Sequence, residues 1–219
     1  MPVSIPVPAR SPGDLLTSAL WNAQVKDNIN KLLARGHRVL TVAQFAALTG
    51  LEGTKGTVAP DEVYLEVDSA SGIQWHLAYE SGEATYKWRY IGGPPMFSEV
   101  TASEGVASAT YAALATAGPS IAIPLAGDYD VEIAGAHYTT ANGGAGSYMS
   151  YDIGGTGAVD VDATINAQAT GVNSAFMSMS HTRRKLGLTA VTLTAKYRAS
   201  TGTGNFLQRR IFVTPVRLV

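Results

Sequence analysis

The stretch GDYDVEIAG, residues 127–135, decides the fold of the C-terminal half of the chain. Its apolar residues Tyr129, Val131 and Ile133 alternate with three acidic residues. A period of two residues places one kind of side chain on each face of a β-strand, so this stretch predicts a strand with one buried face. The stretch TAVTLTAKYR, residues 189–198, repeats the alternation. Together they predict an antiparallel sheet with its core on one side.

Further strand candidates recur through the C-terminal half, with turn residues between them. They span residues 120–124, 128–136, 147–153, 176–181, 189–198 and 206–213. This spacing is typical of two packed antiparallel sheets. We therefore predict a mainly β chain whose residues 97–219 form an antiparallel β-sandwich of the jelly-roll type.

A clear helix pattern precedes this region. Residues 1–13 hold four prolines and predict an extended arm that is either disordered or laid along a neighbouring subunit. Residues 14–35 predict an α-helix with one apolar stripe, which packs either on its own domain or against symmetry-related copies. We assign residues 1–40 to an arm and anchoring helix. The residues expected to anchor the chain or join its copies are Leu20, Trp21, Val25, Asn28, Ile29 and Leu32.

Residues 41–96 predict a small aromatic module. Residues 41–49 form either a short helix or the approach to a strand. Aromatic residues then alternate with polar ones around Trp75 and Trp88, which predicts an antiparallel β-meander with one aromatic face. The aromatic rings could be a stacking platform for sugar or nucleic acid, but so small a module needs them for its core, and we favour the core.

The composition excludes several classes of function. The net charge is −1 over 219 residues, and there is no cysteine. Binding to nucleic acid needs a concentrated excess of Lys and Arg, so we expect no nucleic-acid partner. The two short basic clusters, residues 183–185 and 209–210, are expected in solvated turns near strand ends.

No targeting segment is expected. The N-terminus lacks the basic and apolar regions of a secretion signal, and no stretch approaches the ~20 apolar residues of a membrane helix. We therefore expect synthesis in the cytoplasm of the producing cell and no membrane partner. If the protein ends up outside a cell, assembly into a particle that is released by lysis would account for it.

The search for catalytic chemistry is negative. None of the four histidines has a metal-binding spacing, and no nucleophile elbow or phosphate loop is present. We expect no enzymatic activity, no catalytic residue, no cofactor and no metal. Asp160 and Asp162 would point the same way on a strand, where an acidic outer face is the ordinary explanation. Tyr138 and Asn142, taken as neighbours in an exposed glycine-rich loop, are a possible surface-binding site for sugar.

Two segments resemble bacteriophage proteins. SALWNAQVKDNIN, residues 18–30, resembles the N-terminal helix of many phage minor structural proteins. Residues 61–97, with W-H-L-x-Y, Y-K-W and G-G-P, resemble a module of phage tail-fibre and minor virion proteins. The C-terminal half, with GDYDVEIAG and RRIFVTPVRLV, resembles the tumour-necrosis-factor-like or complement-like jelly rolls that cap trimeric fibres.

These resemblances imply a virion structural protein that forms a homotrimer. Its arm and helix would bind other virion proteins, and its sandwich would contact a host-surface glycan or protein. A tail-fibre, tail-tip or minor tail protein is the first hypothesis. A capsid decoration or head-fibre protein is the alternative in the same class, and a carbohydrate-binding lectin domain is the rival in another. A capsule-degrading enzyme comes last, because the sequence offers no convincing pair of carboxylates.

Overall fold

The computed structural model describes residues 39–49, 62–80, 82–141, 143–167 and 175–219. The predicted arm and helix, with all six anchoring residues from Leu20 to Leu32, lie outside the described residues, as does Asn142. Residues 39–219 belong to one compact unit, which is the subject of all that follows.

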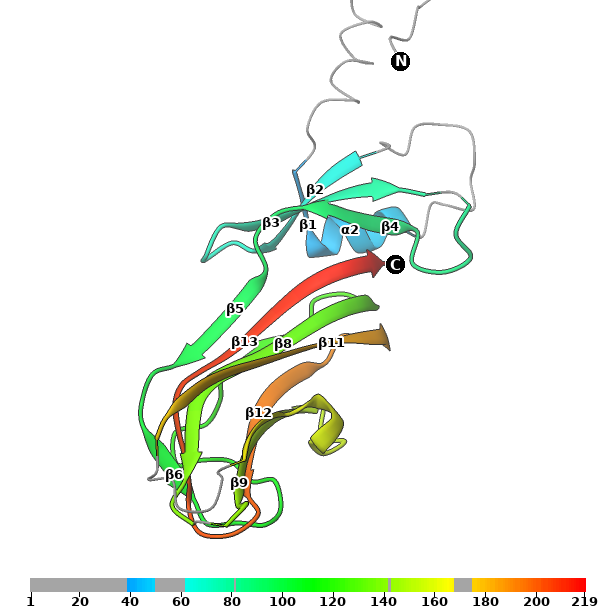
Figure 1. Ribbon diagram of the computed structural model, residues 1–219. Coiled ribbons are helices and arrows are strands. Elements are labelled where there is room, and N and C mark those ends of the chain that lie inside the picture. Colours follow the sequence, from blue (N-terminus) through cyan, green and yellow to red (C-terminus); the bar gives the residue numbers. More distant parts are fainter. Residues whose placement is uncertain (1–38, 50–61, 81, 142, 168–174) are drawn as a thin grey trace, which may run out of the picture. The chain divides into compact units, whose positions relative to one another are not determined.

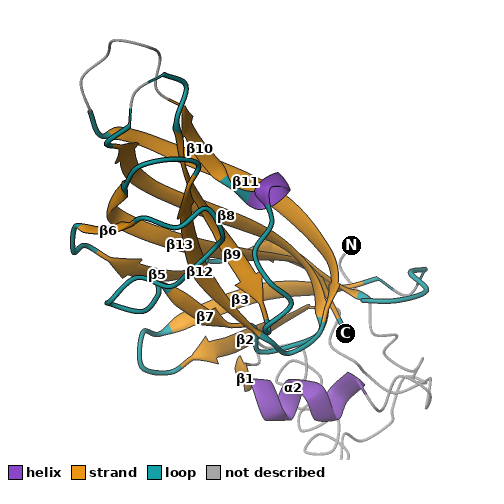
Figure 2. Cartoon of the chain, turned by 90° about the horizontal axis from the view of Figure 1, so that it is seen from below, coloured by secondary structure: helices purple, strands orange, loops and turns teal. Residues whose placement is uncertain are grey.

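Two antiparallel sheets face each other in the C-terminal half (Figures 1 and 2). One is the part of a nine-stranded sheet that comes from residues 96–219, and it consists of β5 (Met96–Val100), β6 (Glu104–Val106), β13 (Gly204–Leu218), β8 (Gly127–Thr139) and β11 (Met177–Leu188). The other has four strands, in the order β10 (Thr164–Ala167), β9 (Gly146–Ile153), β12 (Thr192–Ala199) and β7 (Ser120–Ala122).

The strand pairing is nested. The pair closest in sequence is β9 with β10, and around it lie β8 with β11, β7 with β12, and β5 and β6 with β13. All of these pairs are antiparallel, so the chain runs as one long ribbon that is folded over into two sheets. This arrangement is a jelly roll, and it confirms the predicted fold class.

The predicted alternation is also confirmed. Tyr129, Val131 and Ile133 are fully buried between the sheets, while the acidic residues between them lie on the outer face of β8. From the other sheet, Leu193 and Tyr197 of β12 complete the core. Each of the six predicted segments contains one of the observed strands or overlaps it. The short strands β5, β6 and β10 were not predicted.

The N-terminal part of the unit is a meander that continues the large sheet. It consists of β1 (Val39–Thr41), α2 (Val42–Thr49), β2 (Glu62–Asp68), β3 (Ile73–Tyr79) and β4 (Trp88–Gly92). β1 pairs in parallel with β2, and β4 pairs with the end of β13. Residues 42–49 form the short helix, which resolves the two options for that segment. The division into a module over 41–96 and a sandwich over 97–219 stays a prediction.

The aromatic residues of the meander are core residues. Trp75 is fully buried and Trp88 is 1% exposed, and Trp88 packs against Phe45 of α2 at 5.2 Å between ring centroids. Tyr129 of the sandwich lies 6.3 Å from the Trp75 ring. The core interpretation is therefore confirmed for both tryptophans, because neither offers a face to a ligand.

Three expectations about charged residues are wrong. Arg209 lies within β13 and is completely buried, because a bulge at Gln208 (φ 51°) turns its side chain toward Tyr197. The basic residues 183–185 lie within β11 and not in a turn. Asp160 and Asp162 belong to a 3-10 turn, η1 (Asp160–Asp162), so they do not line one face of a strand.

Candidate functional site

The outer face of the strands β5, β13, β8 and β11 is the first surface that could bind a partner. Phe97 of β5 is 49% exposed, and its ring lies 4.9 Å from that of Phe212 on β13. Both rings point away from the core, since their strand neighbours Met96, Ile211 and Val213 pack inward. Phe212 itself is half-buried. An exposed ring that packs on a second ring on the outer face of a sheet is a candidate contact surface.

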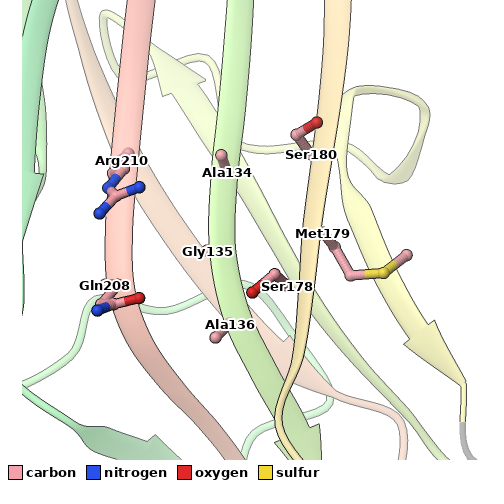
Figure 3. A pocket seen from close by; sticks show the side chains of 8 residues that line it. All are labelled: Ala134, Gly135, Ala136, Ser178, Met179, Ser180, Gln208 and Arg210. Atoms are coloured by element: carbon pink, nitrogen blue, oxygen red, sulfur yellow. The ribbon is translucent and has the colours of Figure 1, made fainter.

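A recess on the strands β13, β8 and β11 is shown in Figure 3. Its volume is about 200 Å³, below that of a pocket for a drug-sized ligand. Ala134, Gly135 and Ala136 of β8 form its floor. Its polar rim comes from β11 and β13 and consists of Ser178, Ser180, Gln208 and Arg210.

The rim of the recess is only partly engaged. Arg210 donates from Nε to Glu99 at 2.6 Å, and its side chain is 41% exposed. The side chains of Gln208, Ser178 and Ser180 make no hydrogen bond to the described residues. The recess can therefore donate and accept hydrogen bonds toward a small polar group, such as a sugar hydroxyl or a side chain of another protein.

Tyr138 lies near the end of β8 and not in a loop, which corrects its predicted setting. Its ring meets that of Phe176 edge to face, with 4.6 Å between centroids. Tyr138 is half-buried, whereas Phe176 is 43% exposed. The pair extends the outer face toward the end of β11. Since Asn142 lies outside the described residues, its part in a sugar site stays a prediction.

The second surface is the edge of the sandwich at which β10 and β11 end their two sheets. Between β9 and β10, the turn η1 lies against this edge. Large apolar side chains are exposed along it: Val159, Val161, Ile165, Met177 and Leu186. Such residues are uncommon on a solvated edge, so this edge is also a candidate contact surface.

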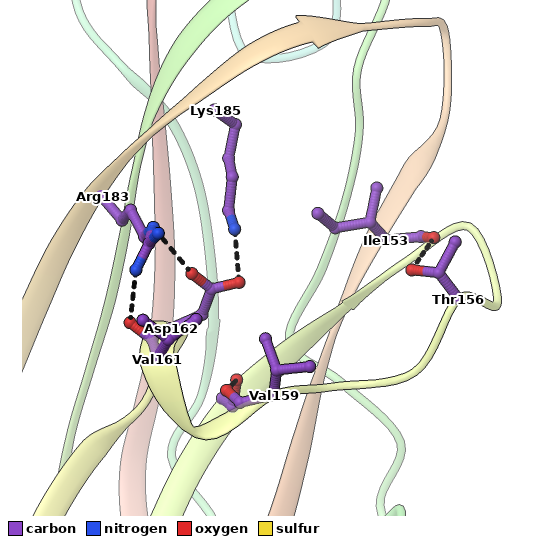
Figure 4. A network of polar contacts seen from close by, with 8 residues as sticks. Ile153, Thr156, Val159, Val161, Asp162, Arg183 and Lys185 are labelled. Carbon is purple, nitrogen blue, oxygen red and sulfur yellow. Dashed lines mark hydrogen bonds and ion pairs between the residues drawn. The ribbon is translucent and has the colours of Figure 1, made fainter.

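Ion pairs hold the turn η1 in place (Figure 4). Asp162 is 1% exposed and pairs with Lys185, and its Oδ1 lies 3.3 Å from Arg183 Nε. Arg183 also donates to the carbonyl of Val161 at 3.1 Å. Asp160 accepts two hydrogen bonds from Arg198, which lower its pKa. These side chains serve to position the turn, because their charges are engaged with one another.

Among the described residues, no three His, Asp or Glu side chains are grouped as metal ligands would be. No helix in that part of the chain is long and apolar enough to cross a membrane. Neither contact surface was found from the sequence, because each combines residues from strands that are far apart along the chain.

Comparison with known proteins gives similarities of fold only. No protein-family model matches the chain, and no curated protein sequence matches it. Among solved structures, Eiger TNF from S. frugiperda is 10% identical, with a TM-score of 0.39 over 57% of this chain and 94% of that one.

Two further structures are similar at the same low level. A carbohydrate-binding module of Cellvibrio mixtus lichenase 5A, in complex with cellotriose, is 21% identical, with a TM-score of 0.27 over 65% of this chain and 87% of that one. Infectious bursal disease virus, Gx strain, is 8% identical, with a TM-score of 0.34 over 66% of this chain and 40% of that one. At these scores the jelly-roll assignment rests on the strand pairing alone.

Proposed function

We propose that this chain is a non-enzymatic structural protein of a bacteriophage particle, of the tail-fibre, tail-tip or minor tail type. Its N-terminal arm and helix attach it to other virion proteins, and its jelly roll faces outward toward the host surface. The copies associate as a homotrimer. The observation that carries the proposal is the presence of two different exposed apolar surfaces on one jelly roll.

These two surfaces do not contain the same residues, and this favours a ring. A contact between unlike surfaces is heterologous, and repeated contacts of this kind close into a ring when the rotation allows it. The outer face has the exposed ring of Phe97 and, in the recess, the small residues Ala134 and Ala136. At the edge around Val161, an ion pair and a hydrogen bond hold η1 against β11. The edge of one copy can therefore pack on the outer face of the next.

The place in a virion is supported by the sequence resemblances at residues 18–30 and 61–97. In the second of these, the W-H-L-x-Y and Y-K-W segments supply the buried rings of Trp75 and Trp88, so they are explained by the fold of the meander. The first segment lies in the predicted anchoring helix, and attachment to the particle is assigned to it.

The association is tested by light scattering of the full chain at micromolar concentration. The mass expected is three times 22.9 kDa, about 69 kDa. Phe97→Ser on the outer face and Val161→Ser on the edge should each lower this mass. Ile91→Ser is the matched control, because Ile91 is 38% exposed but lies on β4, outside both surfaces. A wild-type mass of 22.9 kDa would overturn the trimer.

The anchor is tested by deletion of residues 1–35. The truncated protein should keep its β-sheet circular dichroism spectrum, since residues 39–219 form one compact unit, but should no longer sediment with particles. Truncated protein that still decorates particles would show that the anchor lies elsewhere.

A carbohydrate-binding role is the second candidate, and the recess in Figure 3 favours it. Its unengaged rim residues suit sugar hydroxyls, which both donate and accept hydrogen bonds. Binding on a glycan array that is lost in Gln208→Ala and kept in Gln74→Ala, a change on the distant strand β3, would support this role. If the chain binds no glycan on the array, the carbohydrate-binding role is contradicted and only the structural role remains.

A further inference from the structure

The two sheets are joined at one end by a buried histidine. His137 of β8 is fully buried. Its Nδ1 lies 2.8 Å from the hydroxyl of Ser147 on β9, and its Nε2 lies 3.0 Å from the hydroxyl of Thr164 on β10. The side-chain amide of Asn166 on β10 donates to the carbonyl oxygen of His137. A single residue therefore links its own sheet to both strands at the end of the other.

Strand β10 depends on this link more than any other strand of its sheet. It is four residues long, and among the described strands it pairs only with β9. Its two inward side chains, Thr164 and Asn166, are 2% and 3% exposed, and both contact His137. By contrast, β9 and β12 point apolar side chains such as Met149 and Leu193 into the core. The attachment of β10 across the sandwich is polar and includes a titratable group.

We propose that His137 is an acid-operated latch, and that its protonation releases β10 from β8 and from its pairing with β9, which opens this edge of the sandwich.

The surroundings of His137 favour the neutral ring. β9 contributes Ser147, β10 contributes Thr164 and Asn166, and β13 contributes Phe206, whose ring is stacked at 5.5 Å. The residue paired with His137 on β11 is Met177. None of these groups is charged or titratable, so no carboxylate compensates a proton on the ring. Burial accordingly lowers the pKa of His137 to about 4, from 6.5.

Charged groups elsewhere on the edge are already paired. Asp162, two residues before Thr164, is held by Lys185 and Arg183. The segment that follows β10, residues 168–174, reads QATGVNS and carries no titratable side chain. A second histidine, His181, lies on β11 beside this edge, and its Nε2 is buried with no hydrogen-bond partner among the described residues. Of the two histidines, His137 is the one bonded to Thr164 and Asn166 of β10, so the response of β10 to acid is assigned to His137.

The direction of the effect follows from the two pKa values. Above pH 6.5 the ring is neutral in both the latched and the released form, and the latch is at full strength. As the pH falls from 6.5 to about 4, the released form gains a proton that the latched form does not, so the latched form loses stability. Each fall of one pH unit within this window shifts the equilibrium tenfold toward the released form, so that the shift at pH 4.5 is about 100-fold.

Release would change a surface that has several exposed apolar residues. It would free one edge of β9 from its only partner on that side and would displace Ile165, which is 40% exposed on β10. The latch itself belongs to the jelly roll of a single chain, so it stands independently of the trimer and of the virion assignment.

The test is hydrogen–deuterium exchange of the full chain at pH 7 and pH 4.5, corrected for the intrinsic pH dependence of exchange. Amides of β10 should lose about 100-fold in protection, whereas those of β12 should change far less. His137→Gln keeps a donor and an acceptor in the site and should abolish the pH dependence of β10. His76→Gln is the matched control, because His76 lies on the outer side of β3 beside Glu62, and it should leave the loss intact.

Two results would overturn the latch. One is equal protection of β10 at both pH values in the wild-type protein. The other is an equal loss in His137→Gln. If His137→Gln fails to fold, the wild-type ring can be titrated by NMR. A pKa near 4 supports the latch, and one near 6.5 contradicts it.

Discussion

Replacement of Asp162 by alanine is expected to destabilise the jelly roll by about 3 kcal/mol. Asp162 is 1% exposed and compensates Lys185, which is 16% exposed, and Arg183. Removal of one partner of a buried ion pair costs about 3–5 kcal/mol, since the remaining charge is left without compensation. The lower end applies here, because the Arg183 side chain is 42% exposed and can return to water.

Asp130→Ala is the matched control. Asp130 pairs bidentately with Arg184, the residue between Arg183 and Lys185 on β11, but the side chains of this pair are 34% and 55% exposed. Exposed pairs contribute at most about 1 kcal/mol, so this variant should be nearly as stable as the wild type.

The assay is urea unfolding at pH 7, with the slope of the transition checked for constancy. Equal losses in the two variants would contradict this expectation, because they would show that burial of the pair does not matter. A large loss in Asp130→Ala alone would refute it as well.

Two further changes have expected outcomes. Trp75→Ala should lower the free energy of unfolding, measured by thermal unfolding, by about 3–5 kcal/mol, because the ring is fully buried. Tyr64→Ala, on the outer side of β2, should lower it clearly less. A smaller decrease for Trp75→Ala would mean that the meander contributes little to the core. Gly127→Ala should destabilise the pairing of β8 with β13, since its Cβ would lie 2.2 Å from the carbonyl oxygen of Arg217. Gly135→Ala should be tolerated in the same thermal assay, because the atom nearest to its Cβ is the flexible Met149 sulfur at 3.0 Å. An equal effect of both substitutions would contradict this expectation.

The regular strands could be predicted because their side chains alternate. In Gly127–Thr139 and Thr192–Ala199, every second residue points into the core, so the period of two is visible in the sequence. β10 shows no such signal, because its buried residues are Thr164 and Asn166. β6 is only three residues long and holds a glycine. A strand whose buried residues are polar, or that is only a few residues long, cannot be recognised from apolar periodicity in the sequence.

The positions of the charged residues could not be predicted from their neighbours in sequence. Arg209 looks like part of an exposed basic pair, but a bulge at Gln208 reverses the direction of its side chain. Within the described residues, neither its Nε nor its Nη2 has a hydrogen-bond partner. A bulge depends on the register of two paired strands, and the register is a property of the folded sheet.

The candidate surfaces were hidden for a related reason. Phe97 and Phe212 lie far apart in the chain and meet only because β5 pairs with β13. The link from His137 to Ser147 and Thr164 likewise requires both sheets to be in place. What the sequence shows is which residues are apolar, and the nested strand pairing decides which of them gather at a surface.

The proposed structural place in a phage particle can be tested by electron microscopy of particles that carry a label on the C-terminus of this chain. We expect label at one fixed location, at the tail for a tail-fibre or minor tail protein or over the shell for a capsid decoration protein, and outward of the attachment point in either case. Particles that form normally and carry no label, while the labelled protein remains free, would contradict the account.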